Sequence, residues 1–277
     1  PVYCSDLFRE FGQVEKIEFG DVFDTSQTTN MGWMFWGCKK LKILDISQFH
    51  TENVTNMTSM FFGCQNLEVL DVSGFHTGKV TGMKNMFYYC QKLSTLDVSN
   101  FDTRNVTDMS CMFEECINLQ SLNVSGFHTE NVTDMEKMFK NCRNLSTLDV
   151  SGFCTKNVTN MKWMFWYCTN LKVLDVSGFD MQKVTDFTDM FRGCVSLKTT
   201  SVEALLKQSK TVNQEQTVGQ EQTVNQEQTV SQERTVGQEQ TASQKQTVSQ
   251  EQTVSQEHAV SQEQAVNQKQ AANHEQT

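Results

Sequence analysis

The chain has 277 residues and a formal net charge of −10 at pH 7. Its composition is split, because residues 1–206 hold all of the Cys, Met, Phe, Trp and Tyr and the only Pro, whereas residues 207–277 hold none of them. One folded domain followed by a polar tail is therefore expected, rather than two globular domains.

The negative charge is concentrated in the tail. Residues 211–277 contain nine Glu against three basic residues, a net of −6, which leaves −4 for residues 1–210. No basic stripe is present, which argues against nucleic acid and anionic membranes as partners. No apolar run approaches the roughly 18 residues of a membrane span. No signal peptide is visible, and because the chain begins at Pro1 we expect a processed product or a fragment.

Residues 1–22 are a degenerate copy of the repeat that follows. Phe8 matches the Phe of the repeat, Phe11 takes the place of its Cys, and Ile17 takes the place of a Leu. Terminal repeats of a solenoid are atypical because they cover the end of the core. We predict that this segment is an N-terminal capping repeat, a role for which Glu10 and Glu15 are suited.

Residues 23–206 repeat with a period of 26. The ladder cysteines have this spacing, at Cys38, Cys64, Cys90, Cys116, Cys142, Cys168 and Cys194. A Phe three residues before each Cys and a Leu three residues after it keep the same step. A fixed period between about 20 and 50 residues predicts a repeat architecture in which each unit packs on its neighbours.

Two periodicities alternate within a unit. The first has the three- and four-residue spacing of a helix, at Val54, Met57, Met60, Phe61 and Cys64. Thr55 is a candidate N-cap of that helical segment. Residues 70–72 then alternate apolar and polar, as in a short strand with one buried face, and residues 73–75 turn the chain. We predict an α/β repeat solenoid, with short parallel strands about 4.8 Å apart on its concave face and short helical segments on its convex face.

The repeat degrades near residue 200, and residues 202–206 are a candidate C-terminal cap. A hexapeptide such as T-V-N-Q-E-Q follows for eleven copies. One Val or Ala in six residues cannot build a core, so residues 207–277 are interpreted as a Gln/Glu-rich tail that is disordered or loosely helical.

The ten cysteines allow two interpretations. The favoured one is that each ladder cysteine is a small buried hydrophobe. The alternative is a redox or metal role, although no C-x-x-C is present and the usual zinc spacing is therefore missing. Unpaired thiols suit a reducing cytosol or an anaerobic habitat.

The unit as a whole resembles a known repeat. The stretch from Phe101 to Leu122 reads F-D-T-R-N-V-T-D-M-S-C-M-F-E-E-C-I-N-L-Q-S-L. It resembles the repeats of the BspA-like leucine-rich-repeat surface proteins, over about residues 23–202. The resemblance implies a leucine-rich-repeat-like solenoid on a bacterial or protist cell surface, with a role in adhesion or host interaction. It implies no catalytic residues.

Two rows of the predicted strands form the candidate ligand face. The first row varies between copies, with Ile43, Val69, Thr95, Ser121, Thr147 and Val173. The second row is mostly acidic, with Asp45, Asp71, Asp97, Asn123, Asp149 and Asp175. Carboxylates about 5 Å apart raise each other's pKa and could hold calcium or a cationic ligand. The favoured interpretation is instead that each accepts hydrogen bonds from the backbone or from the Ser two residues later.

Two further groups are weaker candidates. His50 and His76 could share a transition metal ion on adjacent coils, but an interpretation as solvated turn residues is favoured. Trp36, Tyr88 and Trp166 each directly follow the Phe that lies three residues before a ladder cysteine, which we call the ladder Phe. Exposed aromatic residues there would bind a protein or a sugar, whereas packing between coils is the favoured alternative.

No nucleophile elbow, P-loop or dinucleotide fingerprint is present, so the sequence predicts no enzymatic activity, no cofactor and no metal. The leading hypothesis is a binding or adhesion module at the cell surface or secreted, with a host or cell-surface protein as partner. One alternative is a structural spacer or surface-layer component without a specific ligand. Another is a cytoplasmic interaction scaffold that keeps its thiols reduced.

Overall fold

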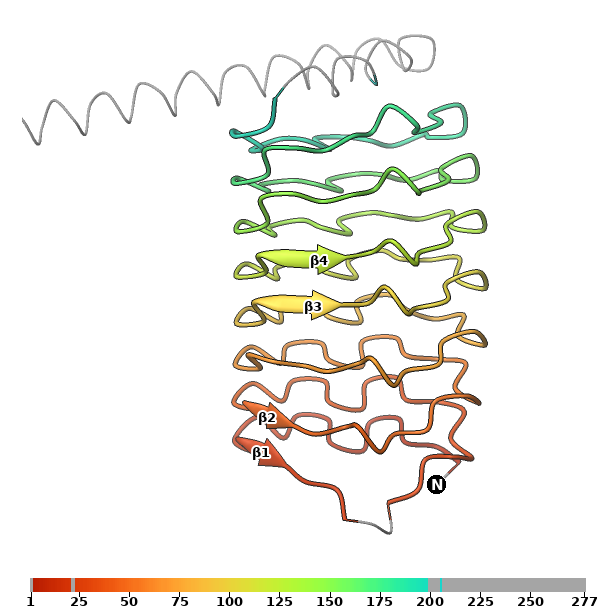
Figure 1. Ribbon diagram of the computed structural model, residues 1–277, viewed down its shortest axis with the longest axis vertical. Helices are drawn as coiled ribbons and strands as arrows, with labels where there is room; N and C mark the ends of the chain where they lie inside the picture. Colours follow the sequence, from red (N-terminus) through yellow and green to blue (C-terminus); the bar gives the residue numbers. More distant parts are fainter. Residues whose placement is uncertain (1, 21–22, 199–204, 206–277) are drawn as a thin grey trace, which may run out of the picture. The chain divides into compact units, whose positions relative to one another are not determined.

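The computed structural model of the protein describes residues 2–20, 23–198 and 205, all of which belong to one compact unit. The predicted tail at 207–277 lies outside these residues, as does the candidate C-terminal cap apart from Leu205. The described chain winds in successive coils that lie one above another (Figure 1). Parallel bridges join each coil to the next at steps of 26 residues, through Asn30, Asn56, Gly82, Asp108, Asp134, Asn160 and Asp186.

One side of each coil carries the strands. β1 (Lys16–Ile17) pairs in parallel with β2 (Ile43–Leu44), and β3 (Thr95–Asp97) pairs in parallel with β4 (Ser121–Asn123). The register Ile17↔Leu44 confirms that Ile17 holds the place of a repeat Leu in the first coil. In β3 and β4 only the central residue is buried, so the residues on either side face solvent as the alternation predicted.

The opposite side of each coil does not form the predicted helical segments, and no helix is present in residues 2–20 and 23–198. Between residues 57 and 64 the backbone N–H groups alternate between hydrogen bonds to the next coil and hydrogen bonds within their own coil. Those of Met57, Ser59, Phe61 and Gly63 donate to carbonyl oxygens of the next coil, at 2.7–2.9 Å. Those of Met60, Phe62 and Cys64 close turns onto the third residue before them. We call this side the turn side.

Positive φ angles explain why the turn side cannot be helical. Ser59 has φ 55° and Gly63 has φ 73°, each at the third position of a turn, where a type II turn requires φ above zero. Two such turns in succession bury residues three and four apart, so they produce the same apolar spacing as a helix. The prediction that Thr55 is an N-cap is also wrong, because no helix follows it. Its hydroxyl donates instead to the carbonyl of Thr29 in the preceding coil.

Backbone hydrogen bonds therefore join adjacent described coils throughout the turn side, and on the strand side at β1–β2, at β3–β4 and at the bridge Thr147↔Val173. Such bonds set a spacing of about 4.8 Å. Figure 1 shows the described coils in a nearly straight column. The strand side is accordingly flat along the stack rather than concave as predicted.

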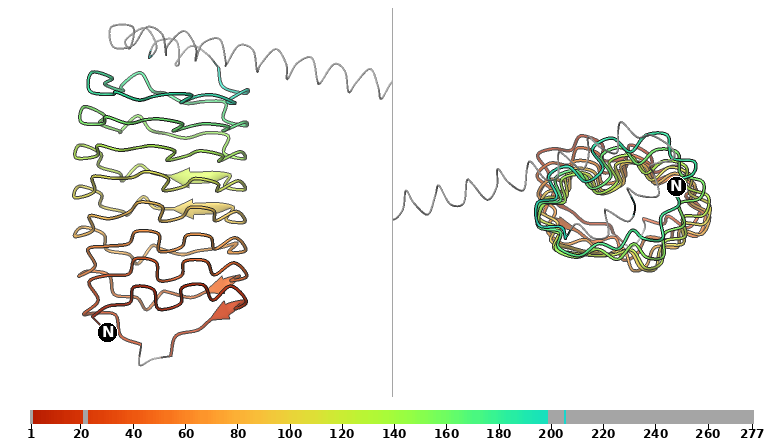
Figure 2. Two further views of the ribbon diagram at one scale, coloured as in Figure 1. Left: turned by 180° about the vertical axis from the view of Figure 1, so that it is seen from behind. Right: turned by 90° about the horizontal axis from the view of Figure 1, so that it is seen from above.

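The interior is one continuous core enclosed by the coils (Figure 2). The ladder Phe rings stack along it, with centroids 5.5–5.6 Å apart and planes within 3–7° of parallel from Phe8 to Phe191. The first coil also exposes apolar side chains, at Val2, Tyr3, Leu7 and Phe11. Its role as a capping repeat stays a prediction.

A buried threonine ladder joins the coils where the backbone turns between the two sides. The hydroxyl of Thr103 donates to the carbonyl of His128 and accepts from the N–H of the same residue, both at 2.8 Å. The same pair of bonds recurs at Thr25, Thr51, Thr77, Thr129 and Thr155. Each Thr hydroxyl thus bonds to both the backbone N–H and the carbonyl of one residue in the next coil, as a neighbouring strand would.

Replacing Thr103 by the isosteric Val should destabilise the protein by roughly 2–4 kcal/mol, because it leaves an N–H and a carbonyl of the next coil unsatisfied. Thr133→Val is the matched control, since the exposed Thr133 hydroxyl makes a single bond to the Thr107 carbonyl. Urea denaturation would measure both variants. Equal losses in the two variants would contradict the role assigned to the threonine ladder.

Candidate functional site

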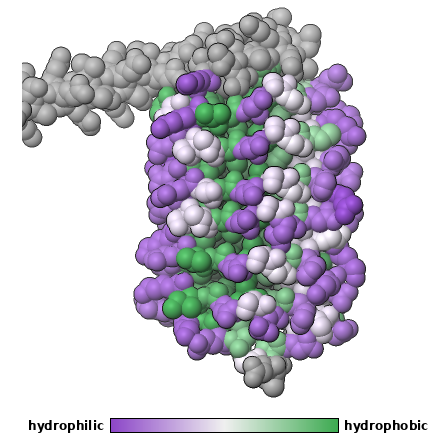
Figure 3. Space-filling model, viewed as in Figure 1, coloured by the Kyte–Doolittle hydropathy of each residue, from purple (hydrophilic) through white to green (hydrophobic). Residues whose placement is uncertain are grey.

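All twelve residues of the candidate ligand face are exposed on the strand side. Parallel pairing brings members of adjacent coils together, as in Thr95↔Ser121, Asp97↔Asn123 and Thr147↔Val173. The aliphatic members are strongly exposed, Ile43 by 56%, Val69 by 71% and Val173 by 60%. Figure 3, in the view of Figure 1, shows an apolar band that runs along the coils between hydrophilic side chains.

The acidic row is held by local turns. The side chain of each member accepts a hydrogen bond from the backbone N–H of the Ser two residues later, at 2.9–3.1 Å. The six acceptors are Asp45, Asp71, Asp97, Asn123, Asp149 and Asp175. This confirms the favoured interpretation of the row. The expected rise in pKa is wrong, because hydrogen bonds from Ser99 lower the pKa of Asp97 and equivalent bonds lower the pKa of the other four carboxyls. Repulsion from Asp45 opposes this at Asp71, but it is the smaller effect.

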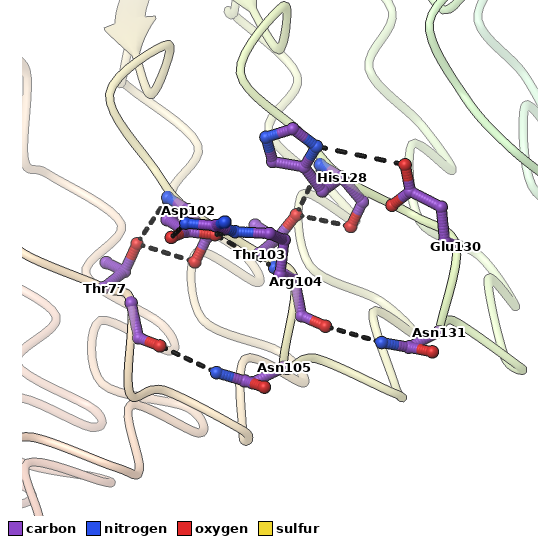
Figure 4. A network of polar contacts seen from close by, with 9 residues as sticks. Thr77, Asp102, Thr103, Arg104, Asn105, His128, Glu130 and Asn131 are labelled. Atoms are coloured by element: carbon purple, nitrogen blue, oxygen red, sulfur yellow. Dashed lines mark hydrogen bonds and ion pairs between the residues drawn. The ribbon is translucent and has the colours of Figure 1, made fainter.

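His128, which is equivalent to His50 and His76 in its own coil, lies beside Thr103 of the threonine ladder (Figure 4). His128 Nδ1 is 3.9 Å from Glu130 Oε1. In the preceding coil Arg104 Nε donates to Asp102 at 2.9 Å, and this side-chain hydrogen bond lowers the pKa of Asp102 to about 2. The amide of Asn131 donates to the Arg104 carbonyl at 2.8 Å, so the polar corner also links the coils.

His50 and His76 are brought together as the sequence suggested, with a carboxylate between them. Their Nδ1 atoms lie 3.7 and 3.8 Å from Glu52 Oε1. All three side chains are about half exposed or more. Within the part of the chain that the structure describes, no group of three or more His, Cys, Asp or Glu could hold a metal ion.

The aromatic residues pack between coils and are partly buried. The rings of Trp36 and Phe62 stack at 5.3 Å, and those of Phe62 and Tyr88 stack at 4.5 Å. Farther along the column Lys140 Nζ of the preceding coil lies 5.2 Å from the ring of Trp166, within range of a cation–π interaction. The prediction of packing between coils is confirmed for Trp36, Tyr88 and Trp166.

The ladder cysteines are buried and unpaired, as the favoured interpretation expected. They also make a hydrogen bond that the sequence did not reveal. The Cys90 thiol donates to the carbonyl of Phe61 in the preceding coil at 3.2 Å, and that carbonyl also accepts from the N–H of Cys64. Burial raises the pKa of Cys38 to about 11 and that of Cys116 to about 12. Raised pKa values oppose nucleophilic and redox chemistry at these thiols.

The threonine ladder and a pair of glycines on the turn side, Gly37 and Gly63, were missed by the sequence analysis. A signal for the ladder was available, because Thr recurs at residues 25, 51, 77, 103, 129 and 155 with the period of the core. Burial distinguishes the ladder from a second Thr row, which is exposed from Thr55 onward, and periodicity alone does not report burial.

A family comparison bears on this architecture. The model of a family described as Mycoplasma protein of unknown function, DUF285, matches residues 3–121 and 90–205. The chain belongs to this family. The match spans the described coils of this DUF285 protein, including the whole candidate ligand face. No curated protein and no solved structure matches the chain. Among the described residues of this DUF285 chain, no helix is long and apolar enough to cross a membrane.

The lowered pKa values of the Asp row predict a pH dependence of stability. A carboxyl whose pKa is lower when folded stabilises the protein above its unfolded pKa of about 3.9, and this stabilisation is lost as the pH falls through the folded pKa. The triple variant Asp71→Asn, Asp97→Asn and Asp149→Asn keeps the acceptors, as Asn123 does naturally, but does not titrate. Its free energy of unfolding should change less between pH 7 and pH 3 than that of the wild type. Chemical denaturation at both pH values measures this, and an unchanged pH dependence would contradict the assignment.

The buried thiols should resist alkylation in the folded protein. With iodoacetamide at pH 8, mass spectrometry should find Cys64, Cys90, Cys142 and Cys168 unmodified, because burial raises their pKa well above the ordinary value. All ten cysteines should react after denaturation. Rapid modification of Cys90 in the native state would be the contrary result.

Proposed function

We propose that this DUF285 protein is a non-enzymatic binding module that works without a cofactor, and that its strand side contacts proteins of a host or neighbouring cell. The observation that carries the proposal is the candidate ligand face. It presents aliphatic side chains that are more than half exposed, next to a row of ionised carboxylates. Exposed apolar groups rimmed by polar ones favour protein contacts.

The pattern of variation supports the same face. The outward row changes from Ile43 and Val69 to Thr95 and Ser121 and back to Val173, whereas the buried Phe, Cys and Leu rows do not change. Since the core is constant, successive coils differ mainly in what they display. Substitution along the outward row would therefore alter a ligand contact without altering the stack.

We further propose that the coils form a leucine-rich-repeat-like solenoid of the BspA-like surface-protein type. The F-D-T-x-N-V-T motif and the 26-residue step support this. A cell-surface or secreted location follows from that resemblance, with a cytoplasmic location as the alternative. The turn side lacks the helical segments typical of a leucine-rich repeat, so the proposed relationship rests on the motif and on the strand side.

Two specific observations favour other roles. Backbone hydrogen bonds that join all adjacent described coils on the turn side would stiffen the column, which suits a structural spacer. Ten unpaired cysteines suit an intracellular scaffold in a reducing compartment. The spacer predicts that the outward row has no ligand, and the scaffold predicts an intracellular partner rather than a host or matrix protein.

Val69→Glu tests the proposal in the full chain. Val69 is the most exposed aliphatic residue of the ligand face, and adding a charge beside Asp71 should weaken binding to host cells and extracellular matrix proteins by about tenfold or more, about 1.4 kcal/mol. Gln182→Glu is the matched control, since it adds the same charge at an exposed turn. Saturation binding of labelled protein measures both. Absence of saturable binding would favour the spacer, and equal binding by the two variants would contradict the assignment of the contact to the strand side.

A further inference from the structure

The turn side of the first coils carries a notch that the proposed function does not use. We call it the glycine notch, because Gly37 and Gly63 line it. It encloses about 780 Å³, within the range of about 300–1,000 Å³ that small-molecule sites occupy. Glu10 borders one end and Tyr89 the other. The notch thus extends over two coils, or about 10 Å.

The two glycines open the notch, but the backbone does not require them. Both have positive φ, 74° and 73°, yet other coils place large side chains at the equivalent position with φ between 57° and 64°, at Glu10, Tyr89, Glu115, Asn141 and Tyr167. A Cβ on Gly63 would meet nothing closer than the Cα of Gly37 at 3.7 Å, which is ordinary contact. A side chain is therefore tolerated at this position. Two consecutive coils lack one there, and this creates the space of the notch.

One wall and one end of the notch are aromatic. The stacked rings of Trp36, Phe62 and Tyr88 line the side wall. Tyr89 lies 5.8 Å from Tyr88 with its ring within 20° of parallel, so a ring face rather than an edge of Tyr89 closes that end. At the other end the Cγ of Glu10 lies 3.6 Å from where a Gly37 Cβ would be.

The notch also has a polar lining. Gln13, Lys39 and Gln65 contribute to it, and together with Glu10 they supply both donors and acceptors. Among the described residues neither Glu10 nor Lys39 takes part in an ion pair. One carboxylate and one ammonium leave the notch without net charge, which favours a neutral ligand.

We propose that the glycine notch binds a short neutral saccharide, with a pyranose ring against the face of Tyr89 and hydroxyl groups toward Gln13, Gln65 and Lys39. A pyranose has an apolar face of C–H groups and a rim of hydroxyls, so it matches a site with one aromatic end and a polar lining that includes amides. An aromatic side chain of a partner protein would fill the apolar part but would bury these polar groups without hydrogen bonds, which is unfavourable.

Calorimetric titration of the full chain tests the proposal, with lactose, maltotriose, cellotriose and chitotriose as probes. At least one should give saturable heat. Gly63→Asn should weaken that binding at least tenfold, because it places in the notch a side chain that Asn141 carries at the equivalent position. Tyr89→Ala should do the same by removing the ring. Tyr167→Ala is the matched control and should leave the affinity unchanged, because its ring lies over Gly193, 2.6 Å from where a Cβ would be, and outside the notch.

Three results would overturn the proposal. The first is no heat with any of the four saccharides, and the second is unchanged saccharide binding by both Gly63→Asn and Tyr89→Ala. The third is saturable binding of the tripeptide Gly-Tyr-Gly instead of a saccharide. The last would indicate a protein side chain as the occupant. Thermal denaturation of each variant separates a filled notch from an unfolded coil. Val69→Glu should keep its affinity for the saccharide, so failure of the protein-binding proposal remains distinguishable from failure of this one.

Discussion

Each coil of this protein depends on its neighbours for backbone hydrogen bonds. Alternate N–H groups of the turn side reach the next coil, and strand residues such as Thr95 pair with residues such as Ser121 on the other side. Unsatisfied buried N–H and carbonyl groups are costly, so the coils must keep one register through the stack. The strict 26-residue step is the sequence expression of that requirement.

The side chains that repeat without change are those that join coils. Phe rings stack on the next ring at 5.5–5.6 Å, Thr103 and its equivalents bond to both backbone groups of one residue in the next coil, and ladder thiols bond to a Phe carbonyl of the preceding coil. An apolar residue of similar size would keep the packing of Thr or Cys but lose these bonds. Repetition here therefore reflects hydrogen bonding as well as burial.

Function is assigned to the positions that this constraint leaves free. On the strand side these are the residues that flank the buried strand centres, such as Val69 and Thr95. On the turn side they are the positions with positive φ, which take Gly63, Tyr89 or Asn141 without disturbing the stack. The two surfaces suit different ligands, because one is flat with exposed aliphatic groups and the other is hollow with an aromatic end.

The sequence by itself determined the period, the buried Phe, Cys and Leu rows, the exposed strand rows and the turns in which Ser47 and its equivalents bond to Asp45 and its equivalents. These follow from local patterns of polarity and spacing. Only the tertiary structure decided that the turn side is not helical, that Thr103 is buried while Thr107 is exposed, and that Gly37 and Gly63 border a notch. The reasons are physical. Turns with positive φ give the same apolar spacing as a helix, so spacing alone does not distinguish them. A hollow between coils depends on which side chains are missing at positions 26 residues apart, and the pattern within one repeat does not contain that information.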